Sequence, residues 1–231
     1  MKKVFITGAN RGLGLGFVKY YLAQGDFVVA TCRTPSAANA LQDLSKKYLT
    51  HLMIEILDVT NEAAFHELKT SLKKKTTAFD IVINNAAVCI EEPIEEWSAK
   101  TFVDSFRVNV VGTALIAKTI SPFLTEGSKL IQMSSGRGSI QENQSGEDGL
   151  DAYGISKAAL NMLTRRLATK FRLRKIIVIS INPGWVQTEM GGASATLTVD
   201  EAIEKMTRTI NKLSLNDCGK FIENDGSDIA W

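Results

Sequence analysis

The feature of this sequence that most restricts its fold is a regular alternation of short apolar runs with segments of helical periodicity. The runs are rich in β-branched residues and apolar at nearly every position, which is typical of parallel strands buried on both faces of a sheet. The predicted strands are Val4–Thr7, Phe27–Cys32, Leu52–Leu57, Asp80–Asn84, Lys129–Met133, Ile176–Asn182 and a short Gly219–Ile222. The predicted helices cover residues 13–24, 36–48, 61–74, 99–125, 153–172 and 199–213. This alternation predicts a doubly wound α/β fold with helices on both faces of a parallel sheet.

Length and composition indicate one soluble domain. The 231 residues suffice for one large core, and no linker, repeat or low-complexity tract divides residues 1–231. A net charge of +2 is too small to favour nucleic acid as a partner. The longest apolar segment, residues 108–124, contains Asn109, Lys118 and Pro122, so no membrane span is expected. Three cysteines at no metal-binding spacing, and no signal-peptide pattern, predict a cytoplasmic protein.

A glycine-rich turn follows the first predicted strand. Residues 7–14 read Thr-Gly-Ala-Asn-Arg-Gly-Leu-Gly and lead into the first helix. In open α/β sheets the ligand crevice lies at the carboxyl ends of the strands, where this turn is placed. Glycines let the backbone approach a pyrophosphate, and the helix N-terminus supplies amide donors. The turn predicts a phosphate-binding site, although a tight connection without a ligand has the same local pattern.

Tyr153 and Lys157 are four residues apart on a predicted helix and therefore share a face. A phenol ordinarily has a pKa near ~10, which is too high for easy proton exchange at neutral pH. A neighbouring ammonium group lowers that pKa toward the working pH. The pair predicts a proton donor, with an exposed helix-surface pair as the alternative from spacing alone.

Three other polar residues occupy positions where chemistry is expected. Ser135 ends the fifth strand, where its hydroxyl can hold a substrate oxygen, with Ser134 as the competing choice and a local backbone contact as the alternative role. Asn109 lies in an apolar helix and needs partners, which a purely structural amide would also need. Asp58 follows the third strand, where its position alone is that of the N-cap of the next helix.

Two other kinds of chemistry lack the residues they need. His51 and His66 adjoin neither a nucleophile nor a carboxylate pair, and residues 134–136 do not form a GxSxG elbow. We therefore expect neither a serine hydrolase nor a metal site. Residues 136–151, rich in Gly, Ser, Gln, Asn and Asp, are predicted to form a long loop.

Taken together, these motifs resemble the short-chain dehydrogenase/reductase family. The shared motifs are the TGxxxGxG turn at 7–14, Asn84-Asn85-Ala86-Ala87, Ser134-Ser135, Tyr153-Gly154-Ile155-Ser156-Lys157 and Asn182-Pro183-Gly184. The resemblance covers essentially the whole chain and implies a single-domain Rossmann fold with strand order 3-2-1-4-5-6-7. Residues 8–16, 156–161, 183–192 and the ending at 219–226 and Trp231 are similar to sniffer-type carbonyl reductases and bacterial C-factor proteins. Ala87 departs from the glycine usual in this family, and the loop before Tyr153 is longer than in many members.

The resemblance implies a role for each candidate. Tyr153 is expected to be the general acid, Lys157 to lower its pKa and orient the cofactor ribose, and Ser135 to position the carbonyl oxygen. Asn109 is expected to hold a water that relays protons to Lys157. The cofactor-binding residues are expected to be Gly8, Asn10, Arg11, Gly12, Leu13, Gly14, Arg33, Asp58, Val59, Asn85, Ala86, Tyr153, Lys157, Pro183, Gly184, Val186 and Thr188.

Within that set, Asp58 is expected to bind the adenine amino group and Thr188 the nicotinamide carboxamide. Asn84 and Ala86 are expected to line the adenosine ribose and the central sheet.

The second strand points to NADP(H) rather than NAD(H). NAD enzymes usually carry an acidic residue after this strand for the ribose 2′-hydroxyl, and the segment ending in Arg33 has none. Arg11 and Arg33 can instead clamp a 2′-phosphate, because guanidinium groups match phosphate in charge and geometry. Two surface arginines without a ligand are the alternative.

The expected function is an NADPH-dependent carbonyl reductase acting on aldehydes, ketones or quinones. The alternative, an NADP(H)-binding regulatory protein with little turnover, follows from the similarity to C-factor proteins. A small hydrophobic carbonyl substrate is expected in a pocket flanked by Val88, Met133, Trp185 and Met190, with residues 191–198 as a mobile lid.

We also expect a homodimer. The predicted helices 99–125 and 153–172 carry more apolar residues than one face requires. Burial wholly within the domain is the alternative.

Overall fold

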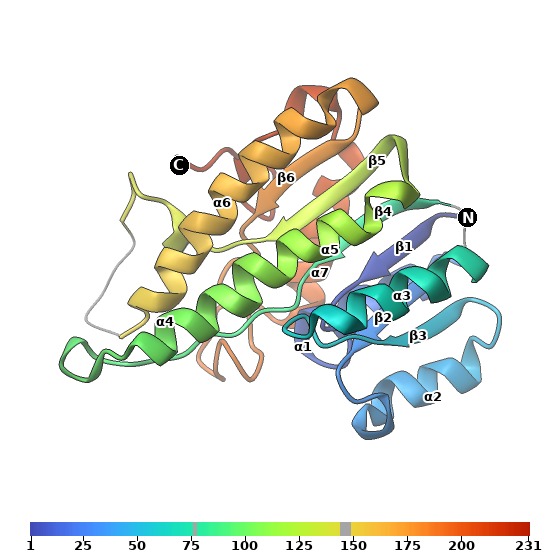
Figure 1. Ribbon diagram of the computed structural model, residues 1–231, viewed down its shortest axis with the longest axis horizontal. Helices are drawn as coiled ribbons and strands as arrows, with labels where there is room; N and C mark the ends of the chain where they lie inside the picture. The colour runs from blue at the N-terminus through green and yellow to red at the C-terminus, as the bar shows by residue number, and fades with distance from the viewer. Residues whose placement is uncertain (76–77, 144–148) are drawn as a thin grey trace.

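The computed structural model describes residues 1–75, 78–143 and 149–231, which form a seven-stranded parallel sheet (Figure 1). The strand order is β3-β2-β1-β4-β5-β6-β7, which confirms the predicted Rossmann topology. The strands are β1 (Lys3–Ile6), β2 (Phe27–Cys32), β3 (Leu52–Ile56), β4 (Phe79–Asn84), β5 (Leu124–Met133), β6 (Ile177–Ile181) and β7 (Phe221–Ile222).

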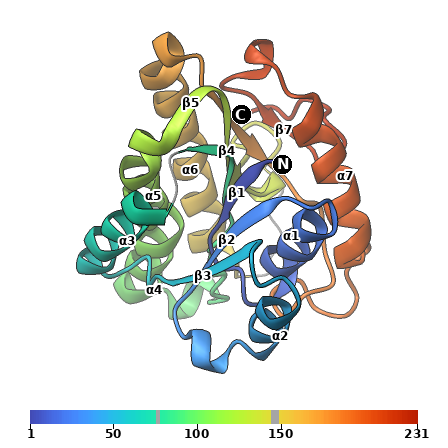
Figure 2. The same cartoon turned by 90° about the vertical axis from the view of Figure 1, so that its right-hand side faces the viewer.

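Helices cover both faces of the sheet (Figure 2). One face carries α1 (Gly12–Ala23), α2 (Asn39–Lys47) and α7 (Val199–Lys212). The other carries α3 (Glu62–Lys75), α4 (Ala99–Phe106), α5 (Thr113–Ile120) and α6 (Asp151–Phe171). Within the described residues, none of these helices combines the length and apolar character needed to span a bilayer.

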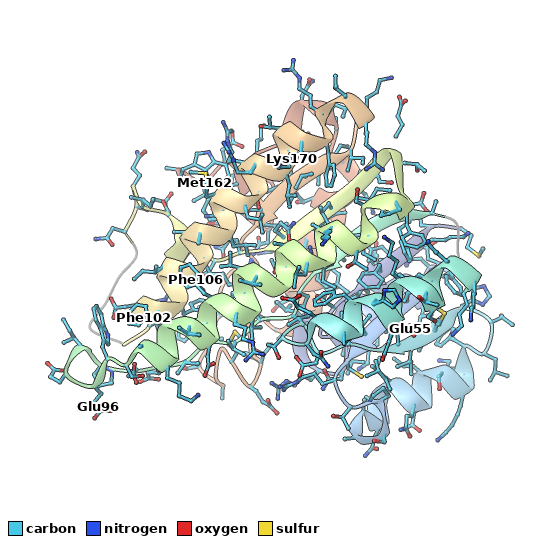
Figure 3. All side chains as sticks on the ribbon, in the orientation of Figure 1. Glu55, Glu96, Phe102, Phe106, Met162 and Lys170 are labelled. Atoms are coloured by element: carbon cyan, nitrogen blue, oxygen red, sulfur yellow. The ribbon has the colours of Figure 1, made fainter. Side chains whose placement is uncertain are left out.

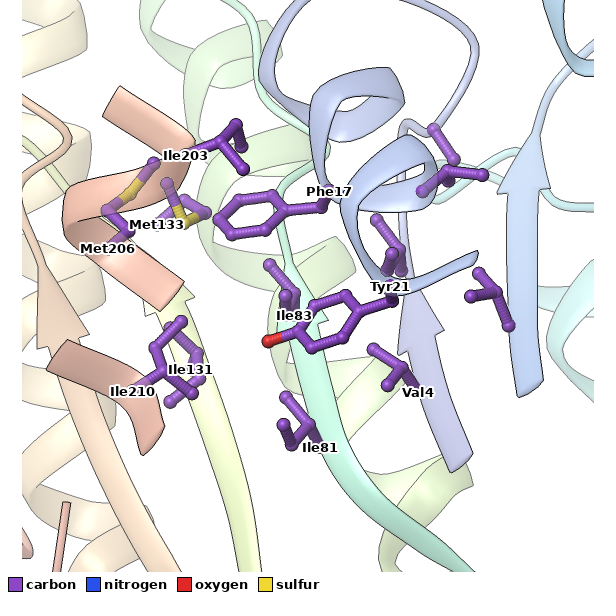
Figure 4. Close-up of a cluster of buried hydrophobic side chains, with 14 of the residues drawn as sticks. Val4, Phe17, Tyr21, Ile81, Ile83, Ile131, Met133, Ile203, Met206 and Ile210 are labelled. Atoms are coloured by element: carbon purple, nitrogen blue, oxygen red, sulfur yellow. The ribbon is translucent and has the colours of Figure 1, made fainter. Parts of the chain in front are cut away.

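The apolar strands supply a core on each side of the sheet. In β1, Val4 and Ile6 belong to the cluster under α1 and α7, and Phe5 belongs to the cluster on the opposite face. Figure 4 shows Phe17 and Tyr21 of α1 in the first of these clusters. Successive strand residues point to opposite faces, so a strand covered on both sides must be apolar at every position.

The predicted single helix at 99–125 is wrong in two respects. It consists of α4, a π-helical segment at Arg107–Gly112 and α5, which ends at Ile120. Pro122 has no N–H to continue the helix, and a 3₁₀ turn at Ser121–Phe123 follows. Strand β5 then begins at Leu124 rather than Lys129, because Leu124 pairs with Phe79 across a register shift in β4.

The carboxyl ends of the strands meet along one edge of the sheet. The glycine-rich turn follows β1, Arg33 follows β2, Asn85 follows β4 and Ser135 follows β5. Parallel pairing aligns these ends, so residues distant in sequence are brought together at this edge.

Candidate active site

A cavity of about 450 Å³ lies at this edge and contains both the glycine-rich turn and the Tyr153–Lys157 pair. The predicted cofactor residues that line it are Gly8, Asn10, Arg11, Gly12, Leu13, Arg33, Asp58, Val59, Asn85, Ala86, Tyr153, Lys157, Pro183 and Thr188. Gly14, Gly184 and Val186 are not among its lining residues. Gly14 lies in the first turn of α1, directly behind Gly8, and Val186 is buried.

The glycine-rich turn has no room for side chains at two of its glycines. Gly8 has a φ of +61°, and a Cβ atom there would lie 2.9 Å from the Cα of Ala86. A Cβ atom on Gly14 would lie 2.2 Å from the carbonyl oxygen of Gly8. These two positions therefore require glycine, which lets the turn pack closely against Ala86 and leaves Gly8 and Gly12 at the surface of the cavity, where a pyrophosphate could approach the backbone.

Asn85 shapes this turn from the end of β4. Its Nδ2 donates to the carbonyl oxygens of Thr7 at 2.9 Å and Gly8 at 3.1 Å, and its backbone N–H donates to Thr7 Oγ1 at 3.0 Å. Asn84, which we expected to line the ribose, is buried instead. Its Nδ2 donates to Oε1 of Gln132 at 2.9 Å, because alternate strand residues face opposite sides of the sheet.

The two arginines lie on the rim of the cavity, but one already has a partner. Arg11 forms an ion pair with Glu189, which lies in the loop after β6 and also lines the cavity. Both side chains are largely exposed. Sequence reasoning missed Glu189, because no local pattern links residues so far apart in the chain.

Asp58 is a turn residue rather than a helix N-cap. Its Oδ1 accepts from Thr60 N at 2.8 Å and Thr60 Oγ1 at 2.7 Å, whereas α3 begins only at Glu62. Burial raises the pKa of Asp58, but the Thr60 hydrogen bonds and the charges of Arg33 and Arg107 outweigh it, so the net pKa is below the ordinary value. A charged carboxylate is thus held at the end of the cavity where the second and third strands end.

Ser135 and Ser134 have different surroundings. Ser134 is buried, and its Oγ donates to Oδ1 of Asn161 at 2.7 Å. The Ser135 hydroxyl accepts from Arg137 N at 3.3 Å and lies near enough to the phenol of Tyr153 to lower the pKa of that group. Of the two serines, Ser135 is therefore the one beside the phenol, whereas Ser134 and not Ser135 is among the residues that line the cavity.

The pKa of Tyr153 is shifted upward, contrary to the expectation from its spacing with Lys157. Burial raises it most and the thiol of Cys89 adds to the rise, while the Ser135 hydrogen bond and the Arg137 charge lower it. Burial wins because a phenolate loses more hydration than these groups restore. The phenol therefore keeps its proton at neutral pH and can donate it.

Lys157 is almost wholly buried beside Tyr153. Its Nζ donates to the carbonyl oxygen of Met133 at 2.8 Å and lies 5.4 Å from the centre of the Tyr153 ring. Burial lowers the pKa of Lys157 to about 8, against a small opposing effect of Cys89. Cys89 thus lies within electrostatic reach of both residues, a neighbour that sequence analysis missed.

Asn109 links three parts of the site. Its Oδ1 accepts from Val88 N at 2.9 Å, and its Nδ2 donates to Val88 O and Ser156 Oγ, each at 2.9 Å. The π-helical segment therefore ties the loop after β4 to helix α6, the structural role that was left open. The predicted water relay to Lys157 remains a prediction.

Three of the four residues that we expected to flank a substrate lie in the cavity wall. Val88, Met133 and Met190 line it, but Trp185 does not, because its ring is half exposed and its Nε1 donates to Gly191 O at 2.7 Å. Of the long loop predicted at 136–151, residues 144–148 lie outside the described residues. Across the described part of the chain, no group of three or more His, Cys, Asp or Glu side chains is arranged to hold a metal ion.

Comparison with known proteins identifies the family. The family model for short chain dehydrogenases matches residues 2–197. The chain belongs to the short-chain dehydrogenase family. This confirms the resemblance found in the sequence motifs.

Two solved structures of the family superpose closely on the chain. The NADPH-bound carbonyl reductase from chicken fatty liver has a TM-score of 0.95 and 34% identity over 100% of this chain and 99% of its own. The carbonyl reductase Sniffer of D. melanogaster has a TM-score of 0.94 and 34% identity over 100% of both chains. The C-signal protein of Myxococcus xanthus is 34% identical over 68% of this chain and 95% of its own length.

Proposed function

We propose that the protein is an NADPH-dependent carbonyl reductase. The observation that carries the proposal is one cavity that contains both the glycine-rich turn, which has no room for a Cβ atom at Gly8 or Gly14, and the Tyr153–Lys157 pair, with Ser135 beside the phenol. A cradle of this kind fits a dinucleotide, and the cluster fits proton transfer to a carbonyl oxygen. The proposed domain spans residues 1–231.

When bound, NADPH supplies the hydride that reduces the carbonyl carbon. The residues then act on the carbonyl oxygen: Ser135 donates a hydrogen bond to it, and Tyr153 transfers its phenolic proton to it, giving an alcohol. The raised pKa of Tyr153 keeps that proton in place until it is needed. Lys157 orients the cofactor ribose and carries a positive charge toward the phenolate that forms.

We assign Asn109 a positioning role in this scheme. All the hydrogen bonds of its amide hold Val88 and Ser156, so it fixes the wall of the cavity relative to the helix of Tyr153. A water-mediated connection from Asn109 to Lys157 would have to use its backbone, whose carbonyl oxygen also accepts from Thr113 Oγ1 at 3.0 Å.

NADP(H) is the proposed cofactor because both cationic groups on the rim suit a 2′-phosphate. Arg11 and Arg33 line the cavity, on the side where Asp58 is expected to bind adenine. The chicken carbonyl reductase, a close structural neighbour, is a NADPH-bound protein. Gly14, Gly184 and Val186 are proposed to support the cofactor site from behind its surface.

The proposed substrate is a small hydrophobic carbonyl compound. Val88, Met133 and Met190 give the substrate side an apolar lining. Residues 191–198 fold back so that Leu197 pairs with Val186, and we propose that this segment opens to admit the substrate.

We propose a homodimer formed through α4 and α6. Exposed apolar side chains on this side of the molecule include Val103, Val111, Ile155 and Met162. Figure 3 shows Met162 on α6, on the same face of the molecule as Phe102 and Phe106 of α4. A patch of this kind favours a protein partner over solvent.

We also propose a cytoplasmic location, because no disulfide joins Cys32, Cys89 or Cys218 among the described residues.

The decisive assay follows the loss of NADPH absorbance with benzaldehyde, diacetyl, a quinone and a sugar phosphate. We expect turnover of the first three and little of the fourth. The similarity to C-signal keeps a regulatory role as a second candidate. Tight NADPH binding without turnover of any carbonyl compound would favour that role and contradict the proposed one.

A further inference from the structure

The C-terminal residues are fastened to the turn that carries Ser135. Ser139 Oγ donates to the carbonyl oxygen of Ala230 at 2.7 Å, and Gln141 N donates to the carbonyl oxygen of Trp231 at 2.8 Å. Ser139 is only 3% exposed and Ala230 is half-buried, so the first of these bonds is partly shielded from water. Together the two bonds hold the tail against residues 139–141.

The tail is itself anchored elsewhere in the fold. The Trp231 ring lies 5.6 Å from the ring of Phe221 in β7, and the Arg165 guanidinium of α6 lies 5.5 Å from the centre of the indole. Arg165 also donates to the carbonyl oxygen of Gly219 at 3.3 Å. The tail is therefore held against β7 and α6, and residues that it contacts are fixed relative to these two elements.

A short path connects this tail to Ser135. Ser135 is the N-cap of the 3₁₀ turn Gly136–Gly138, and its carbonyl oxygen accepts from Gly138 N at 2.8 Å. Helix α6 supports the turn from below, because Asn161 Nδ2 donates to Gly138 O at 3.1 Å. The far end of the turn, at Ser139, is held by the tail.

We propose that Trp231 is a positioning residue for carbonyl reduction, acting through residues 139–141 to fix the turn that presents Ser135 to the substrate. The inference rests on the proposed function for its catalytic consequence. Trp231, Ala230 and Ser139 do not line the cavity that holds the cofactor residues. Loosening the tail should therefore weaken use of the carbonyl substrate and leave NADPH binding intact.

The first test follows the tail contact itself, without any turnover. Hydrogen exchange of the Gln141 amide should be slow in the parent and at least about tenfold faster in Trp231→Ala, because its acceptor is no longer held in place. Trp97→Ala is the matched control, since it removes another indole, one that contacts Phe102. Equal exchange rates at Gln141 in parent and Trp231→Ala would overturn the proposal.

The second test compares steady-state kinetics with benzaldehyde and NADPH. Trp231→Ala and Ser139→Ala should each raise KM for benzaldehyde about three- to tenfold, the range expected for the loss of one partly buried hydrogen bond. The double variant should show less than the product of the two effects, because both act through one contact. Trp231→Phe should restore most of the loss, since it keeps an aromatic ring between Phe221 and Arg165.

The same variants separate a positioning role from a merely structural one. The dissociation constant of NADPH, measured by fluorescence titration, should stay within about twofold of the parent. A lower melting temperature with unchanged KM, or a KM that rises in step with the NADPH dissociation constant, would overturn the proposal. A parent that reduces no carbonyl compound would overturn the proposed function instead, while Gln141 exchange would still test the tail contact.

Discussion

Lys157 keeps an ammonium group in a place where water scarcely reaches. Its pKa of about 8 lies below the value near ~10.4 expected in an unfolded chain. Below pH 8 the folded protein must therefore bury a charge, and this cost disappears as pH rises from about 8 to about 10.4. The residue thus destabilises the fold at neutral pH.

Substitution of Lys157 by methionine tests this linkage. The melting temperature of Lys157→Met relative to the parent should be most favourable at pH 6 to 7 and should decline as pH rises through about 8 to 10. The lost bond to Met133 shifts the difference by a constant and does not change its slope. Lys118→Met, at an exposed position of α5, is the control. A difference that does not vary with pH would contradict the burial argument.

We expect Glu189 to compete with the 2′-phosphate of NADPH for Arg11, because the two residues form an ion pair. Glu189→Gln removes the carboxylate from the ion pair and leaves Arg11 available to a 2′-phosphate. We expect up to about fivefold tighter binding of NADPH, the size typical of an exposed pair, and almost no change for NADH. Fluorescence titrations of both cofactors measure this, with Glu204→Gln, from the exposed pair with Arg208 on α7, as the control. An equal change for both cofactors would show that Glu189 does not act through the 2′-phosphate.

For single residues, the sequence predicts where the site residues lie in the fold, but it does not predict which groups they contact. Tyr153, Lys157 and Ser135 lie together as their spacing and position predict, because helix periodicity and strand ends determine where they fall. The upward pKa shift of Tyr153 depends on three-dimensional burial, which no spacing reveals. Likewise, no pattern in the sequence indicates that Arg11 pairs with Glu189.

Among the elements, the π-helical segment between α4 and α5 joins the loop after β4 to α6 through the side chain of Asn109. Replacing Asn109 by alanine would leave the N–H and carbonyl of Val88 without their partner. A buried polar group left unpaired costs about 1–3 kcal/mol, and because these two groups are only partly buried, we expect a total loss of about 1–2 kcal/mol in the free energy of unfolding. Urea denaturation measures it, with Asn211→Ala near the surface as the control. A loss below about 0.5 kcal/mol would show that the tether is dispensable.

Element types were predicted more accurately than element ends. All seven strands exist where apolar, β-branched runs predicted them, since full burial leaves a plain pattern. The end of the helix at Ile120 was missed although Pro122 marked it, because the apolar pattern continues into β5. The π-helical turn at Arg107–Gly112 has no sequence pattern of its own, and the tertiary hydrogen bonds of Asn109 within it are seen only in three dimensions.

For the whole molecule, the exposed apolar face of α4 and α6 leads us to expect a dimer, and a measurement of the oligomeric state tests this expectation directly. Light scattering at micromolar concentration should give the mass of a dimer. Met162, which is 63% exposed, should lie in the interface, so Met162→Glu should give a monomer with unchanged secondary structure. Leu173→Glu, at a position 97% exposed beyond the end of α6, should remain a dimer. A monomeric parent would remove the proposal.

The central claim is that the phenol of Tyr153 supplies the proton for carbonyl reduction, and Tyr153→Phe tests it most directly. The substitution removes one hydroxyl and keeps the ring beside Lys157. With NADPH and benzaldehyde, kcat should fall by about 10²–10⁴-fold, the usual contribution of a positioned proton donor. The NADPH dissociation constant and the melting temperature should remain close to those of the parent. A folded variant that binds NADPH and reduces benzaldehyde at the parental rate would contradict the account.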